Sequence, residues 1–377
     1  MGGRTAILPD PAAAVSRIEM SPPDRSQKTG VMPGMVRIHT TSKWTRAATL
    51  ALLAGCLPTA GCSMIRAYQA QHRVAAGESL LEHDDLEGAL AEFQAAVELD
   101  PQLAVVHNRL GVIYRRMGEY DRAIDCFANA VRFNPFSFED TISLAQLYHF
   151  TQRLHDAVQA YLQACDLRPK DFNSRLNLGV CYHQLGDFNQ AVEQFQQAIS
   201  LDPDQPGAFV NLGVAFDAQG KYYEAISSYR NALERDNHQP RVLVNLANTY
   251  MNQQRFKMGR NALEQAIRMD PTLPAAHQGM GNCQFLMQEY DAAESSYREA
   301  LAYEPRLPAA HAGLGLIAML RHLQDPNAPR LRDQALEHWH RSLELDPNQP
   351  KIRSLVEKYR PSAVDPTTVL LGQSSSE

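Results

Sequence analysis

Few residues in this sequence combine a reactive type with the spacing that a known chemistry needs. Segment 313–318, Gly-Leu-Gly-Leu-Ile-Ala, has the letters of a dinucleotide-binding turn, but no strand pattern precedes it. His338 and His340 stand two residues apart, which directs them to different sides of a helix, so we expect both to be polar residues on the surface. His277 and His311 share one position of a repeated pattern, without an evident carboxylate or cysteine as a further ligand. The sequence therefore predicts no catalytic residue, no metal site and no cofactor, and indicates a protein that is not an enzyme.

The six cysteines divide into two groups. Four fall on predicted helices, where a free thiol behaves as a small buried apolar residue; they are Cys126, Cys165, Cys181 and Cys283. Cys165 and Cys181 lie on neighbouring helices of consecutive repeats, so a disulfide between them is the alternative in an oxidising compartment. The other two, Cys56 and Cys62, follow an apolar run near the amino terminus.

Residues 35–62 have the organisation of a secretory signal. A basic stretch precedes the apolar run Ala47–Ala54, and small residues follow it. The run ends in Leu-Ala-Gly-Cys56, which resembles the lipobox of bacterial lipoproteins, where the cysteine is diacylated and becomes the mature amino terminus. Thr-Ala-Gly-Cys62 is a second candidate, and a signal without a lipid is the alternative to both. We expect lipidation at Cys56, with Cys62 as the other possibility.

Residues 1–34 are rich in Pro and Gly and have neither helical nor strand periodicity. Because the signal has an ordinary length only when it is counted from Met35, we expect translation to begin there or at Met32. Residues 1–34 are accordingly expected to be disordered or not to belong to the translated protein.

An internal repeat supplies the elements that position every other residue. Pro101, Pro135, Pro169 and Pro203 follow one another at intervals of 34 residues, and the same frame continues to Pro347 after one insertion. The eighth position of each unit is Gly or Ala, the twentieth is almost always Ala, and the twenty-fourth is almost always an aromatic ring. The units begin near Ala70, Ala104, Phe138, Phe172, Pro206, Pro240, Pro274 and Pro308.

This pattern predicts two antiparallel amphipathic helices per unit, because small residues let two helix axes approach while the ring fills the space between them. One such hairpin cannot bury its apolar face alone, so the units must stack. The sequence resembles the tetratricopeptide repeat family over residues 70–349. That resemblance implies an all-α, right-handed superhelical solenoid of eight helix hairpins, in which the first helix of each unit lines a concave surface.

The departures from the pattern are local. Gly259 and Leu263 weaken the sixth unit, since Gly inside a helix costs about 1 kcal/mol relative to Ala. About eight extra residues within 321–331 are expected to lengthen the turn of the eighth unit. Residues 350–359 are predicted to form a polar capping helix, and residues 360–377 a disordered tail.

Asparagines are the candidate contacts for a partner. Asn177, Asn211 and Asn245 occupy the sixth position of three consecutive units, and Asn248 and Asn282 occupy the ninth position of units six and seven. The ladder is similar to one in the repeat domain of O-GlcNAc transferases, which implies that it grips the backbone of an extended peptide. An Asn amide offers a donor and an acceptor to any peptide unit. Alternatively, Asn at this position is ordinary repeat consensus.

Composition narrows the function further. The 377 residues carry a formal net charge of −6, which disfavours a basic nucleic-acid-binding protein, and no apolar run has the length of a membrane-spanning helix. We therefore expect an exported, lipid-anchored scaffold of the bacterial envelope, facing the periplasm and more readily on the outer than on the inner membrane. Its partners would be proteins or extended peptides rather than nucleic acid or small molecules, in the assembly of a pilus or secretion complex. The alternative is a substrate-recruiting subunit of a cell-envelope enzyme in peptidoglycan or glycan processing.

Overall fold

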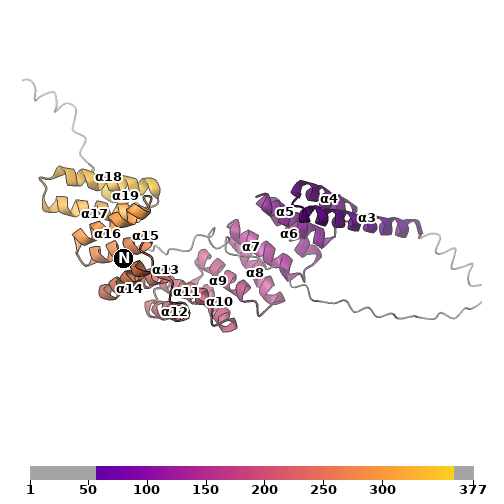
Figure 1. Cartoon of the computed structure of the whole chain (residues 1–377), viewed down its shortest axis with the longest axis horizontal. Coiled ribbons are helices and arrows are strands. Elements are labelled where there is room, and N and C mark those ends of the chain that lie inside the picture. Colours follow the sequence, from indigo (N-terminus) through magenta and orange to yellow (C-terminus); the bar gives the residue numbers. More distant parts are fainter. Residues whose placement is uncertain (1–56, 361–377) are drawn as a thin grey trace, which may run out of the picture. The chain divides into compact units, whose positions relative to one another are not determined.

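The computed structural model describes residues 57–360, with the side chains of residues 57–63 left aside. The described residues form seventeen α-helices and no strand (Figure 1). They divide into two compact units, with the division between Asp187 and Phe188. The predictions for residues 1–34 and for the tail beyond Arg360 fall outside the described residues, as does Cys56.

The amino-terminal unit contains three helix pairs and one further helix. Its helices are α3 (Leu57–Glu82), α4 (Leu86–Leu99), α5 (Ala104–Arg116), α6 (Tyr120–Phe133), α7 (Phe138–Phe150), α8 (Leu154–Leu167) and α9 (Phe172–Leu185). Each first helix packs along the second helix of its own repeat, and each second helix packs against the first helix of the following repeat.

The carboxy-terminal unit contains α10, four helix pairs and a final helix. Its helices are α10 (Phe188–Leu201), α11 (Pro206–Ala218), α12 (Tyr222–Arg235), α13 (Pro240–Asn252), α14 (Phe256–Met269), α15 (Pro274–Leu286), α16 (Tyr290–Tyr303), α17 (Pro308–Gln324), α18 (Pro329–Leu345) and α19 (Pro350–Tyr359). The boundary between the units thus falls within the predicted fourth repeat, between α9 and α10.

The predicted contact between a small residue and a ring occurs in several hairpins. A Cβ atom added to Gly111 would lie 3.0 Å from the ring of Phe127, and one added to Gly213 would lie 2.6 Å from the ring of Tyr229. Both rings are almost fully buried. A large side chain at the eighth position would collide with the facing ring at this helix spacing, so the prediction of small residues there is confirmed.

The turn between the two helices of a repeat uses the left-handed backbone conformation. Gly118, Gly186 and Gly220 have φ angles of +78°, +83° and +75°. Non-glycine residues take the same conformation at the equivalent position of four other repeats; they are Asp84, Gln152, Gln254 and Gln288. The turn geometry is therefore a property of the repeat, and glycine is the residue that adopts it with least strain.

The eighth repeat corrects one prediction. The turn between α17 and α18, residues 325–328, is only one residue longer than the turn between α15 and α16, residues 287–289. Helices α17 and α18 are each 17 residues long, whereas α15 and α16 have 13 and 14. The apolar run Ile317–Leu320 continues the helical pattern of α17, and Pro329, which suits a first helical position, starts α18. Most of the extra residues are therefore absorbed as additional helical turns.

Candidate peptide-binding face

The structure distributes the predicted asparagines over both units. Asn177 lies on α9 in the amino-terminal unit, whereas the other four lie on α11, α13 and α15 of the carboxy-terminal unit. Helix α13 contacts both α11 and α15, so the first helices of repeats five to seven are direct neighbours. We call the half-buried residues of these three helices, which include Asn211, Asn245, Asn248 and Asn282, the amide face.

Three amides of this face are available to a ligand. Asn211, Asn245 and Asn248 are half-buried, and their side chains have no hydrogen-bond partner within residues 57–360. An unpaired amide at a half-buried position is a donor and acceptor that a peptide backbone can satisfy. Asn177 is likewise half-buried and unpartnered among the described residues, but it belongs to the other unit.

Asn282 has a fixed orientation. Its Oδ1 accepts a hydrogen bond of 2.8 Å from the hydroxyl of Tyr297, the buried ring of the same repeat. This bond occupies the amide oxygen and leaves the NH₂ group as the donor toward a ligand. Burial raises the pKa of the Tyr297 hydroxyl, so it remains a protonated donor at neutral pH.

Asp217 is a member of the face that sequence reasoning missed. Its carboxylate accepts a hydrogen bond of 2.8 Å from the Tyr229 hydroxyl and one of 2.7 Å from Thr249 Oγ1. Burial raises the pKa of the Asp217 carboxyl above its ordinary value, while the two hydrogen bonds act in the opposite direction. These bonds join α11, α12 and α13 and so connect the fifth repeat to the sixth. No spacing in the sequence marks the three residues as partners.

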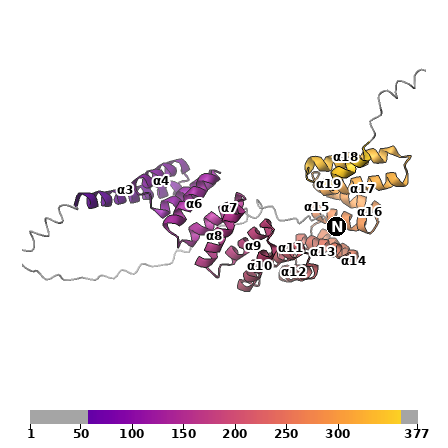
Figure 2. The same cartoon turned by 180° about the vertical axis from the view of Figure 1, so that it is seen from behind.

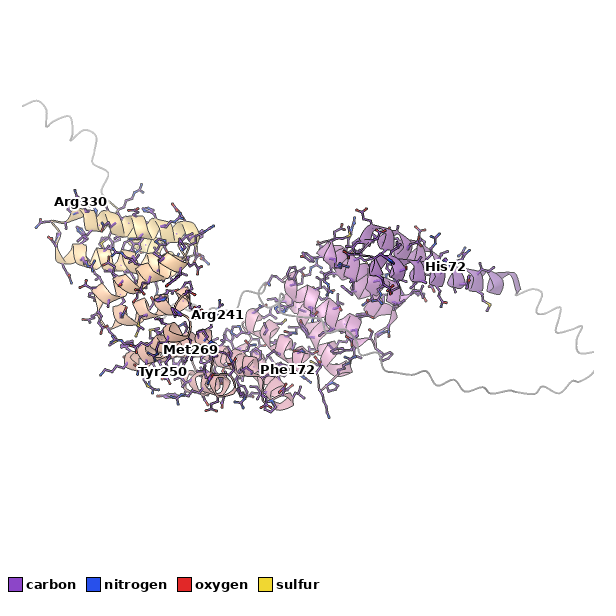
Figure 3. All side chains as sticks on the ribbon, in the orientation of Figure 1. His72, Phe172, Arg241, Tyr250, Met269 and Arg330 are labelled. Carbon is purple, nitrogen blue, oxygen red and sulfur yellow. The ribbon has the colours of Figure 1, made fainter. Side chains whose placement is uncertain are left out.

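The surroundings of the amides carry little charge. Asp217 and Arg241 are the only charged residues of α11, α13 and α15. Arg241, labelled in Figure 3, is exposed. On α5 in the amino-terminal unit, by contrast, Arg109 and Arg116 form ion pairs with Glu78 and Asp84. The amide face is therefore a neutral surface, and its polarity comes mainly from amide groups.

The histidines are arranged differently from the sequence prediction. His277 is buried, with Nε2 bonded to the Pro271 carbonyl at 2.8 Å and Nδ1 3.0 Å from a Glu299 oxygen. His311 lies instead beside His338, with their Nδ1 atoms 3.4 Å apart. The prediction that His338 lies on the surface was wrong, because its side chain is half-buried, and burial together with His311 lowers its pKa. Within residues 57–360, no group of three or more His, Cys, Asp or Glu side chains could hold a metal ion.

The cysteines of the repeats are free thiols. Cys165, Cys181 and Cys283 are buried, and no disulfide joins Cys165 to Cys181 in the structure. Burial raises the pKa of Cys181 to about 12 and that of Cys126 to about 11, so both remain protonated at neutral pH. They pack as small apolar residues, as the sequence predicts.

The glycine-rich segment and the two amino-terminal cysteines do not belong to the amide face. Gly313 and Gly315 lie inside α17 and pack against the rings of Tyr297 and Trp339, so the segment 313–318 serves helix packing. Cys62 falls within α3, and Cys56 precedes the described residues. Among the described residues, no helix combines the length and apolarity that crossing a membrane requires.

Comparison with known families identifies the repeats. The family described as TPR repeat matches residues 77–118, 145–186 and 181–220, and the family described as tetratricopeptide repeat matches residues 104–137 and 218–260. This chain is a tetratricopeptide-repeat protein. No curated protein matches its sequence.

Solved structures share the tetratricopeptide-repeat fold. A chain of the APC/C heterotetramer Cut9–Hcn1 aligns with 73% of this chain and 52% of its own length, at 16% identity and a TM-score of 0.52. The C-terminal part of a TPR repeat-containing protein from Cytophaga hutchinsonii aligns over 63% of this chain and 98% of its own length, at 19% identity and a TM-score of 0.52. A tetratricopeptide repeat protein from Parabacteroides merdae aligns over 66% and 99%, at 15% identity and a TM-score of 0.50. At these identities the likeness shows the fold alone.

Proposed function

We propose that this tetratricopeptide-repeat protein is an interaction scaffold that binds an extended, largely uncharged protein segment on the amide face. The repeats and the repeat proteins of similar structure support a role in protein interaction. The observation that carries the finer proposal is the set of unpaired, half-buried amides of Asn211, Asn245 and Asn248 on adjacent helices. These amides can bond peptide groups without demanding a particular side chain.

The low charge of the amide face limits the kind of protein segment that can bind there. A charged side chain of the bound segment would lose water where it contacts α11, α13 and α15. Of the two charged residues of these helices, Arg241 is exposed, whereas Asp217 is already bonded to Tyr229 and Thr249. An unpaired charge that loses water is costly. The segment is therefore expected to present backbone and small or apolar side chains.

Substitution of the three amides tests this proposal. The experiment compares the full-length chain with a triple variant, Asn211→Ala, Asn245→Ala and Asn248→Ala. Both are used to capture envelope proteins, and the affinity of each for the captured segment is then measured by fluorescence anisotropy. At about 1 kcal/mol per lost hydrogen-bonding amide, the triple variant should bind roughly 150-fold more weakly. Asn261→Ala, at an exposed position of α14, is the control and should bind like the unmodified chain. Equal binding by the triple variant, with helicity unchanged, refutes the amide face as the site.

We further propose that the chain is exported and anchored by a lipid on Cys56, or else on Cys62, and that it assists assembly of a pilus or secretion complex. The lipobox-like segments that end at Cys56 and Cys62 support the anchor, and the interaction scaffold supports the assembly role. Cys56→Ala should release the protein from membranes; if only Cys62→Ala does so, Cys62 is the acylated residue.

Capture of pilin or secretin components supports assembly, whereas a stoichiometric envelope hydrolase or transferase supports the role of an enzyme's accessory subunit.

A further inference from the structure

The amides of the amide face form two rows that cross adjacent helices. Asn211 on α11 and Asn245 on α13 occupy the sixth position of their repeats. Asn248 on α13 and Asn282 on α15 occupy the ninth position. The three helices follow one another along the carboxy-terminal unit in both views (Figures 1 and 2), and α13 contacts both of the others. The two amides of each row are therefore separated by one interaxial distance, about 8–10 Å for packed helices.

This spacing matches the repeat of a polyproline II helix. In that conformation the backbone advances about 3.1 Å per residue and turns once in three residues, so carbonyl groups that point in the same direction recur about every 9 Å. In a β-strand they recur every second residue, at about 6.7 Å and then at about 13 Å. Neither strand distance equals the separation of neighbouring helices. Of the two extended conformations, polyproline II is therefore the one that presents equivalent carbonyl groups to the amides of adjacent helices.

Asn282 favours a ligand that accepts hydrogen bonds. Its Oδ1 already accepts the 2.8 Å bond from the Tyr297 hydroxyl, so its Nδ2 donors are left for a ligand. A polyproline II segment has no internal hydrogen bonds, and its carbonyl groups are free to accept. Proline in addition has no N–H group, so a proline-rich segment buries few donors that need an acceptor on the face. The fixed orientation of Asn282 thus suits a ligand that presents carbonyl groups and few N–H groups.

The apolar part of the face suits the side chain of proline. Val210 and Val214 on α11 are both half-buried and lie four residues apart, which places them on the same side of the helix. A pyrrolidine ring can pack on such a surface without placing a charge beside the amides. The low charge of α11, α13 and α15 and these two valines therefore favour the same kind of ligand.

We propose that the amide face binds a proline-rich, uncharged protein segment in the polyproline II conformation. This inference rests on the proposed function of the amide face and adds the conformation and composition of the ligand. Two turns of such a segment, about six residues, cover the distance from α11 to α15. Because proline fixes φ near about −65° in the free segment, binding costs little conformational entropy.

Fluorescence anisotropy with three labelled, uncharged peptides of equal length tests the inference on the full-length chain. One repeats Pro-Pro-Ala, one repeats Gly-Ser-Ala and is flexible, and one repeats Thr-Val-Ser and favours a β-strand. The proline peptide should bind at least about tenfold more tightly than either of the others, because it is already in the bound conformation.

Single substitutions show whether the proline peptide uses the amide rows. Asn248→Ala and Asn282→Ala should each weaken its binding roughly fivefold, the effect of one lost hydrogen bond. Asn261→Ala, at an exposed position of α14, is the matched control and should bind the peptide like the unmodified chain. Circular dichroism should show the same helicity for all three variants. Asn248 has no internal bond to Tyr297, so its substitution tests the row even if Asn282→Ala disturbs the hairpin.

The other outcomes overturn the inference in distinguishable ways. Equal or tighter binding of the flexible or the strand-forming peptide would show that the face does not require polyproline II. Binding of the proline peptide that is unchanged in Asn248→Ala and Asn282→Ala would place that peptide elsewhere on the chain. Failure of the proline peptide to bind would also overturn the inference. The proposed function would still stand in each case if the captured segment loses affinity for the triple variant, and would fail with it if that affinity is unchanged.

Discussion

Gly213→Ala probes the close contact between a small residue and a ring that recurs in several hairpins. The added methyl group would lie 2.6 Å from the Tyr229 ring, whereas carbon atoms in contact sit at about 3.5–4.0 Å, so ring or helix must move by about 1 Å. Tyr229 is 1% exposed, and its hydroxyl is bonded to Asp217, so the ring has little freedom to move. Overpacking costs about 1–3 kcal/mol, and the higher helix propensity of Ala offsets up to about 1 kcal/mol of this. The expected net loss is about 1–2 kcal/mol of unfolding free energy.

Gly207→Ala is the control in the same helix, because nothing lies within 4 Å of the atom it adds. Urea denaturation followed by circular dichroism should therefore show destabilisation for Gly213→Ala and none for Gly207→Ala. Repeat three has Ala145 against Tyr161 in the equivalent pair, so a hairpin can accept the methyl group when its ring is free to adjust.

A double-mutant cycle tests that explanation. Tyr229→Phe removes the bond to Asp217 and frees the ring, so Gly213→Ala should cost less in the Tyr229→Phe background than alone. Equal stability of the two single glycine variants would refute the steric argument. A cost unchanged by Tyr229→Phe would refute the role of Asp217 in holding the ring.

Three further predictions concern the carboxy-terminal unit. Because burial raises the pKa of the Asp217 carboxyl, the folded chain binds its proton more tightly than the unfolded chain does. The free energy of unfolding should therefore fall as the pH rises from about 3.9, the ordinary Asp value, through the pKa of the folded state. Asp217→Asn should remove this fall from a plot of urea midpoint against pH. Gly259→Ala should leave the melting temperature nearly unchanged, because the gain in helix propensity of up to about 1 kcal/mol is offset by close contacts of the new methyl group with Met251 Cγ at 3.1 Å and with the Ala247 carbonyl oxygen at 3.2 Å. Arg321 forms ion pairs with Asp291 and Glu294 of the preceding repeat. Arg321→Gln should therefore lower the free energy of unfolding by about 1 kcal/mol in low salt and by less in high salt, as urea denaturation can measure.

Some features of the fold could be read directly from the repeat. The pair Gly213 and Tyr229 belongs to one hairpin, and its counterparts recur in other repeats, so each copy supports the interpretation of the others. The helix pairs and the positions of small residues could therefore be predicted, because the pattern is local and recurs from repeat to repeat. The first helix, however, begins at Leu57 rather than near Ala70, because the residues before the repeat frame also continue the helix.

The candidate site was predicted less completely. The sequence singled out the asparagines, because their repeated position was visible. It offered no sign that Tyr297 occupies the Asn282 oxygen, or that the other amides have no side-chain partner among the described residues. It also gave no sign of Asp217, whose partner Thr249 belongs to the next repeat. Side-chain rotamers and the fit between neighbouring repeats decide such contacts, and a positional pattern does not record them.

The sequence by itself therefore determined that this protein is a stack of helix hairpins, since the contacts that define a hairpin lie within one 34-residue period. The tertiary structure alone decided which polar groups are left for a partner and which are used internally. It placed His311 beside His338, absorbed most of the insertion of the eighth repeat into two longer helices, and left Met64, Ile65 and Tyr68 of α3 exposed. Each of these depends on how elements pack against one another or on what fails to pack, and packing is a property of the assembled helices.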